Sequence, residues 1–402
     1  MGISGEVGVA GSLVLKRAAL VVLGLYVSGM AVRVYARKYY IFLPDYLRWT
    51  LTRPAPPPGT LHIFLLFADH FEPEYDAARV RTWGERYRAL ARRHHDRDGR
   101  PPQHTFFYPG DQPRADVFAA LHDLVDSGLG EVELHYHHDF DTEQTFRGKL
   151  ETAIRTFQQY GFLKTLDGGT HFAFVHGNWG LDNSNGASLC GVNTELRLLH
   201  ELGCFADFTF PSVYEDSQPP FVNAIYAARD DDRPKSYDRR LPLTDLDRGA
   251  DVMLFEGPLL FYPSRRPRQL FLGLDDGDVH PAVPASPDRV DRWVRAGVHV
   301  DRRPDWIFIK VHGHGISSPA DADAVLGPGY DAALSWLEHH YNDGRRYRLH
   351  YITAREAYNL ARAAAAGATG EPEQYFDRPV PPYVADVRQP VEKEQGDEGN
   401  PR

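Results

Sequence analysis

The stretch Leu61-His62-Ile63-Phe64-Leu65-Leu66-Phe67-Ala68-Asp69-His70-Phe71-Glu72-Pro73 indicates the fold of this chain. Its first seven residues are apolar apart from His62, which is the composition and length of a strand buried on both faces. Polar residues follow directly at Asp69, His70 and Glu72. In parallel α/β sheets, chemistry collects at the carboxyl ends of the strands. The stretch therefore predicts a buried parallel strand that ends in a functional site.

Outward from this stretch, short apolar segments alternate with helical patterns. We expect further strands at residues 132–137, 172–175, 204–210, 252–255, 270–274 and 306–311. We expect helices at residues 80–94, 115–127, 150–160, 193–202 and 288–296. A last helix is expected after Thr353, with Glu356 completing a capping box. This alternation predicts an α/β domain with a mainly parallel sheet, either an open doubly wound sheet or a (β/α) barrel.

The N-terminal segment differs in composition from the rest of the chain. Lys16 and Arg17 precede an apolar run at residues 18–32, and a mixture of basic and aromatic residues follows, as is typical of the lipid headgroup region. We expect residues 1–53 to be an uncleaved membrane anchor with an interfacial segment; an ordinary buried helix is the alternative. The excess of Lys and Arg after the run predicts that the following domain lies on the cytoplasmic side, with the periplasmic side as the alternative.

The remaining boundaries follow from composition. Residues 54–59, Pro-Ala-Pro-Pro-Pro-Gly, are typical of a stiff linker. We expect one folded domain over residues 60–366, with a surface insertion at about 213–248, where Asp, Arg and Pro are frequent. Residues 367–402 are rich in Pro, Gly and acidic residues, which predicts a disordered tail.

Charge and cysteine content exclude some classes of function. Among 402 residues, 55 Asp and Glu outnumber 45 Lys and Arg, and the net charge is −10. This balance disfavours a nucleic-acid partner, which would require a basic surface. Cys190 and Cys204 are too few for a disulfide framework and lack the spacing of a zinc ribbon. A metal site is therefore expected from the 19 His and the carboxylates.

The strand expected at 132–137 carries the clearest metal-binding pattern. Successive side chains of a strand alternate between its faces, so His135 and His137 share one face. Two imidazoles suit zinc or another first-row divalent ion. Asp69 or His70 would complete a site of three ligands with an open position for water. The residues that could replace one of these ligands are His138, Asp139 and Asp141.

Two other strand ends carry residues that apolar packing does not require. The strand at 172–175 is followed by His176-Gly177-Asn178-Trp179-Gly180. The strand at 306–311 is followed by His312-Gly313-His314-Gly315, whose glycines permit a tight loop and the close approach of a ligand.

Taken in order, these motifs resemble those of the polysaccharide deacetylase family, carbohydrate esterase family 4 of the glycoside hydrolase/deacetylase superfamily. The resemblance covers roughly residues 61–360. It implies that residues 60–366 form a deformed (β/α) barrel of mainly parallel strands. It also implies a divalent metal, commonly zinc, that serves in removing N-acetyl groups from sugars.

The resemblance assigns roles to individual residues. Phe67-Ala68-Asp69-His70-Phe71 occupies the place of the family motif Thr-Phe-Asp-Asp-Gly, so Asp69 matches the general base and His70 replaces a ligand Asp. The family's two metal-ligating His residues lie four positions apart, a spacing that His135 and His137 do not reproduce. His312 matches the general acid. The expected site thus comprises catalytic Asp69 and His312, metal ligands His70, His135 and His137, and a substrate groove with His176, Asn178 and Trp179.

We therefore expect a membrane-associated, metal-dependent hydrolase that acts on carbon–nitrogen bonds other than peptide bonds. Its expected substrate is an N-acetylated saccharide, its metal zinc, and its other partner the membrane. One alternative is a different metallohydrolase such as a phosphoesterase, because clustered His and Asp also suit two-metal sites. The other is a carbohydrate-binding or scaffold barrel without catalysis.

Overall fold

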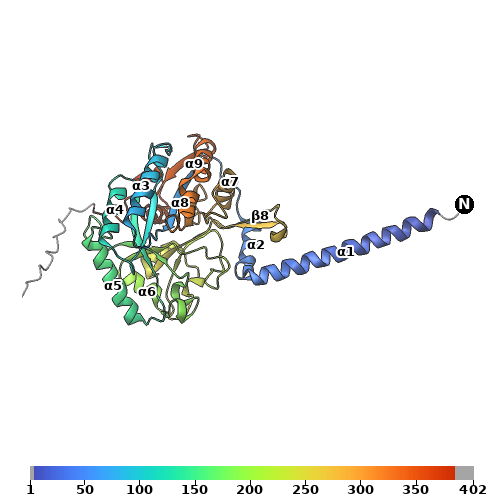
Figure 1. Ribbon diagram of the computed structural model, residues 1–402, viewed down its shortest axis with the longest axis horizontal. Coiled ribbons are helices and arrows are strands. Elements are labelled where there is room, and N and C mark those ends of the chain that lie inside the picture. The colour runs from blue at the N-terminus through green and yellow to red at the C-terminus, as the bar shows by residue number, and fades with distance from the viewer. Residues whose placement is uncertain (1–3, 385–402) are drawn as a thin grey trace, which may run out of the picture.

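A computed structural model describes residues 4–384 and contains an α/β domain from which one long helix projects (Figure 1). The strands of the central sheet are β1 Leu61–His70, β2 His104–Pro109, β3 Gly130–Tyr136, β4 Phe172–His176, β5 Cys204–Asp207, β6 Ala224–Ala228, β7 Val252–Glu256, β10 Trp306–Gly313 and β11 Tyr347–Tyr351. Their order is β10-β1-β2-β3-β4-β5-β7-β6, and β11 pairs with the first half of β1. Every pair is parallel except β6 with β7. The α/β class and the mainly parallel sheet are thus confirmed.

Helices cover the sheet, and the sheet separates two apolar clusters, one on each of its faces. The helices are α3 Ala77–Ala91, α4 Ala115–Val125, α5 Glu143–Gln159, α6 Glu195–Glu201, α7 Pro287–Ala296, α8 Pro319–Leu326, α9 Pro328–His340 and α10 Ala354–Ala365. On the outer face, Leu65 and Phe67 of β1 pack with α3 and its neighbouring helices. On the inner face, Leu66 and Ala68 pack in the cluster to which α10 belongs. The expected capping box of Thr353 and Glu356 begins α10.

The sheet is strongly curved around its inner face. Neighbouring strands lie about 4.8 Å apart, so β10 and β5 would be roughly 24 Å apart in a flat sheet. Nevertheless, Lys310 of β10 donates a hydrogen bond of 2.9 Å to the carbonyl of Phe208, which directly follows β5. Within residues 4–384, no ladder joins β6 to β10 at the two ends of the sheet. The expected deformed (β/α) barrel is therefore not confirmed.

The expectation of a surface insertion at residues 213–248 is wrong. All five residues of β6 are buried, and the strand forms the edge of the central sheet beside β7. The apolar sequence Ala-Ile-Tyr-Ala-Ala is short, and the charged turn at 229–233 directly follows it. The strand was not predicted because the charged residues of the turn dominate the composition of the whole segment.

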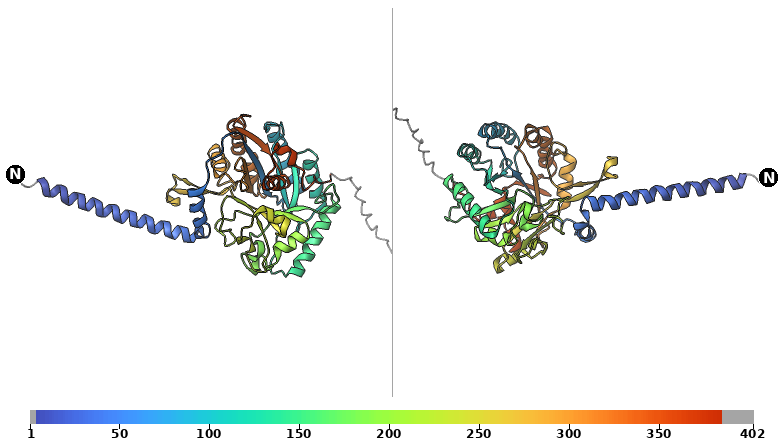
Figure 2. Two further views of the ribbon diagram at one scale, coloured as in Figure 1. Left: turned by 180° about the vertical axis from the view of Figure 1, so that it is seen from behind. Right: turned by 60° about the horizontal axis from the view of Figure 1, so that its bottom comes forward.

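The N-terminal segment forms α1 Ser4–Ala36, which extends away from the domain, and the shorter α2 Leu43–Thr52 (Figure 2). Residues 17–36 of α1 have a mean hydropathy of 1.7 and are not buried in the domain. Twenty helical residues span about 30 Å, so α1 is long and apolar enough to cross a membrane. A signal sequence meets the same criteria. Tyr39, Phe42 and Tyr46 attach this segment to the domain. They pack against the hairpin of β8 Leu260–Pro263 and β9 Leu272–Asp275, where Tyr39 and Tyr46 contact Phe261.

The expected disordered tail is ordered over residues 367–384. Val380 is buried, and the amide of Asn359 donates to its carbonyl at 2.8 Å. The Tyr383 hydroxyl donates to Glu133 at 2.7 Å. The prediction failed here because a few apolar and aromatic anchors suffice to fix a segment of polar composition. Residues 385–402, the rest of the predicted tail, lie outside the described residues.

Candidate metal centre

The carboxyl ends of β1, β3 and β10 bring several of the expected His side chains together on the inner face. The ring of His70 at the end of β1 lies 4.9 Å from the ring of His135 and 4.7 Å from that of His314. Nε2 of His135 lies 3.2 Å from Nε2 of His137. The three residues expected to bind metal are thus neighbours, and the alternation of side chains along β3 places His135 and His137 on the same face.

Glu72 completes this cluster, although no pattern in the sequence distinguished it as a ligand. Its Oε1 lies 2.8 Å from Nε2 of His135 and 3.3 Å from Nε2 of His137. One ligand atom from each of His70, Glu72 and His135 lies within 4.8 Å of the other two, and we call these residues the strand-end trio. His137 stands beside the trio, and its Nδ1 lies 3.3 Å from Asp111.

The protonation of the strand-end trio suits a cation. Burial and the neighbouring imidazoles, His314 foremost, hold the pKa of His70 well below its usual range, so its ring is neutral. Burial raises the pKa of Glu72, but hydrogen bonds from His135 and His137 outweigh it and hold that pKa well below the usual value. Metal ligands must be deprotonated in this way. Nδ1 of His70 is buried and has no hydrogen-bond partner among the described residues, so it is free to bind a ligand.

The trio is also accessible. The side chain of Glu72 is 22% exposed and that of His137 is 27% exposed, whereas His135 is fully buried. An ion held here would keep an open side, which is the hallmark of a catalytic rather than a structural site.

Trp179 and His312 border the trio. The indole of Trp179 stacks on His70 with a centroid distance of 5.2 Å and an interplanar angle of 26°. The ring of His312 lies 6.1 Å from the indole of Trp179 in an edge-to-face arrangement. Burial and the nearby Lys310 ammonium hold the pKa of His312 well below its usual range. Its imidazole is therefore neutral at pH 7, and its Nδ1 has no partner among the described residues.

Asp69 does not join this cluster. It precedes His70 in β1, so its side chain points to the outer face. Its Oδ2 lies 2.8 Å from Nε2 of His104, and its Oδ1 accepts a hydrogen bond of 2.6 Å from the backbone N–H of Gly315. Asp69 is fully buried and both of its oxygens are engaged, so it fixes the loop after β10 and is not placed as the expected general base.

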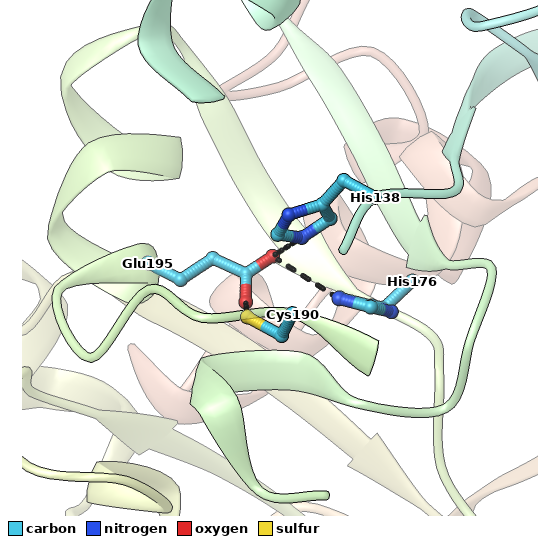
Figure 3. A group of neighbouring side chains, drawn as sticks. All are labelled: His138, His176, Cys190 and Glu195. Carbon is cyan, nitrogen blue, oxygen red and sulfur yellow. Dashed lines mark hydrogen bonds and ion pairs between the residues drawn. The ribbon is translucent and has the colours of Figure 1, made fainter. Parts of the chain in front are cut away.

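His176 is likewise on the outer face and does not line a substrate groove. It lies in a buried group with His138, Cys190 and Glu195, which we call the cysteine tetrad (Figure 3). Ligand atoms of the four residues all lie within 4.8 Å of one another, so the tetrad could hold a metal ion. Asn178 donates a hydrogen bond of 2.8 Å to the carbonyl of His138 and is half-buried. Of the three expected groove residues, only Trp179 therefore borders the strand-end trio.

The sequence signal for the tetrad was weak. Its members are separated by up to 57 positions, from His138 to Glu195. Cys190 appeared as a lone cysteine because its partners come from other elements. Burial and the Glu195 carboxylate raise the pKa of the Cys190 thiol. Recognising this group requires the three-dimensional structure.

No protein-family model matches the chain, and no curated protein sequence matches it.

Proposed function

We propose that this protein is a metal-dependent hydrolase that removes N-acetyl groups from a saccharide, with a deformed, open (β/α) barrel as its scaffold. The observation that carries the proposal is the accessible strand-end trio at the carboxyl ends of β1 and β3. The resemblance of the motifs to those of polysaccharide deacetylases suggests the substrate class.

The proposed chemistry uses residues around the trio. His70, Glu72 and His135 would hold the metal, and their two imidazoles and one carboxylate fit zinc. A divalent ion supplies Lewis acidity and lowers the pKa of a bound water. Nδ1 of His312 has no partner among the described residues, so it would be available to take a proton from the attacking water and later deliver it to the departing amine. Asp111 orients His137 at the edge of the site.

Trp179 gives the site a surface for a sugar. Its half-exposed indole lies beside His70 and His312, and the exposed part of such a ring packs against the apolar face of a pyranose. The acetylated nitrogen of that sugar would then lie between the trio and His312.

We also propose that α1 is an uncleaved membrane anchor that holds the domain at the cytoplasmic face. Its last turn is bound to the domain, because Arg33 donates to the carbonyl of Leu272 in the hairpin. The basic residues that follow the apolar run support this orientation.

The test is acetate release from chitooligosaccharides by the full-length protein in detergent, with added zinc, cobalt or manganese. His135→Ala should lose metal and turnover together. His312→Gln should retain the metal and lose roughly 10²–10⁴-fold in turnover, the usual contribution of proton transfer. Hydrolysis of aryl phosphates without acetate release would instead indicate a phosphoesterase. Sugar binding that chelators leave unchanged, without turnover, would indicate a non-catalytic barrel.

A further inference from the structure

We propose that the cysteine tetrad is a second, closed metal site that binds zinc and fixes the loop carrying Trp179. This site is independent of the proposed hydrolase activity, because it shares no ligand with the strand-end trio. Its residues come from different parts of the fold (Figure 3): His138 follows β3, His176 ends β4, Cys190 lies in the next loop and Glu195 begins α6.

The separations between one oxygen of Glu195 and the two imidazole nitrogens fit a tetrahedral ion. Bonds of about 2.0–2.3 Å to zinc place neighbouring ligand atoms roughly 3.3–3.8 Å apart. Oε1 of Glu195 lies 3.4 Å from Nε2 of His138 and 3.8 Å from Nε2 of His176. Oε2 of Glu195 lies 3.2 Å from the sulfur of Cys190.

An unpaired nitrogen points into the group. Nε2 of His176 is fully buried and has no hydrogen-bond partner among the described residues. Figure 3 shows it directed toward Glu195, at a distance that exceeds a hydrogen bond. Buried polar atoms in native proteins nearly always have a partner, and a metal ion at the centre of the tetrad would supply one.

The ligand chemistry selects the ion and its role. One thiolate, two imidazoles and one carboxylate suit zinc, whereas calcium and magnesium require oxygen ligands. His138 is 3% exposed and the other three residues are not exposed at all, so no position is open for water or substrate. Closed sites of four ligands are structural.

A bound ion would hold the loop between His176 and Glu195, whose backbone conformation requires support. Trp179, Asp182 and Asn183 have φ values of 53°, 54° and 53°, which residues other than glycine adopt only when the surrounding structure holds them. Cys190 and Glu195 close the far end of this loop, and His176 closes the near end. The ion would therefore hold Trp179 against His70 at the mouth of the strand-end trio.

The alternative is a tetrad without an ion, in which the four side chains form a hydrogen-bonded network. The backbone N–H groups of Asn178 and Gly180 donate hydrogen bonds of 3.2 and 3.3 Å to Nδ1 of His176. While Nδ1 accepts these bonds, Nε2 of the neutral ring carries the hydrogen, so metal binding through Nε2 requires both bonds to break. Glu195 would then accept hydrogen bonds from the surrounding donors, and the tetrad would be a polar network only.

Cobalt substitution of the full-length protein in detergent distinguishes the two arrangements. We expect a cobalt–thiolate charge-transfer absorption, because the tetrad contains sulfur and the strand-end trio does not. The absorption should be lost in Cys190→Ser and retained in His135→Ala. Cys204→Ser is the matched control, since Cys204 is also buried but lies outside the tetrad.

X-ray absorption at the zinc edge of the wild-type protein tests the same claim without any variant. We expect a sulfur neighbour at about 2.3 Å from zinc. Folded wild-type protein that shows neither the sulfur neighbour nor the cobalt–thiolate absorption would overturn the proposal. Either result leaves the hydrolase proposal to be decided by acetate release.

Discussion

The buried carboxylate of Asp69 joins β1 to the start of β2 through His104, and to the loop after β10 through the backbone of Gly315. Asp69→Asn should therefore lower the free energy of unfolding by about 1.5–3 kcal/mol, the usual worth of hydrogen bonds to a charged group. Chemical denaturation of the full-length protein measures this change, and His104→Gln should cause a loss in the same direction. An Asp69→Asn protein of unchanged stability and metal content that has lost all turnover would instead establish Asp69 as the general base.

Individual site residues could be predicted where they follow the alternation of side chains between the two faces of a strand. This alternation correctly placed His135 and His137 on one face of β3, and it also separates Asp69 from His70, which sequence reasoning had given to one site. Glu72 lies beyond the end of β1, where the path of the chain no longer follows a period. Its role depends on long-range contacts with β3 that no local pattern reveals.

At the scale of elements, His94 links the end of α3 to α9. Its two ring nitrogens lie 2.9 Å from Asp331 and 3.2 Å from Glu338. Burial lowers the pKa of His94, but these two carboxylates outweigh it and raise the pKa above its ordinary 6.5. The link should therefore stabilise the fold fully below about pH 6.5, where the unfolded state is also protonated, and lose its effect as pH rises through the folded-state pKa.

Unfolding free energies measured against pH for wild type and His94→Gln test this link. The difference between the two proteins should be largest in acid and shrink as the pH rises. His95→Gln is the control, because the side chain of His95 is exposed. A difference in unfolding free energy that grows as the pH rises would contradict the proposed link between His94 and the two carboxylates.

The segment at residues 367–384 is a second element with a measurable contribution. A chain that ends at residue 366 loses the contacts of Val380 and Tyr383 and leaves the amide of Asn359 unpaired. We expect its free energy of unfolding to fall by roughly 3 kcal/mol or more, since each buried hydrogen bond contributes about 0.5–1.5 kcal/mol and an unpaired buried group costs more. The matched control ends at residue 384. Equal stability of the two truncated chains would show that the segment contributes nothing.

Elements were predictable where their signals were local. The capping box of Thr353 and Glu356 correctly predicted the start of α10, and the apolar run at residues 61–67 correctly predicted β1. By contrast, β6 and β11 are five residues each, and both are placed by pairing with distant strands. Pairing partners, and hence the closure of the barrel, depend on the curvature of the whole sheet.

For the whole molecule, the projecting α1 predicts attachment to a membrane. The native protein should sediment with membranes and resist extraction at high pH, and removal of residues 1–36 should release it. Leu25→Arg should weaken retention, because an Arg near the middle of a spanning helix costs about 2.5–3.5 kcal/mol on insertion scales. Leu25→Ala serves as its control. A mature protein whose N-terminus lies beyond Ala36 would identify α1 as a cleaved signal sequence.

The measurement that most directly tests the central claim is metal content and acetate release, determined together on the full-length protein and on His135→Ala. We predict bound zinc in the wild-type protein, about one equivalent less in the variant, and loss of acetate release with that equivalent. Cys204→Ser should match the wild type in both quantities. A folded wild-type protein that binds no metal after incubation with zinc, cobalt or manganese would contradict the account, as would acetate release that His135→Ala leaves unchanged.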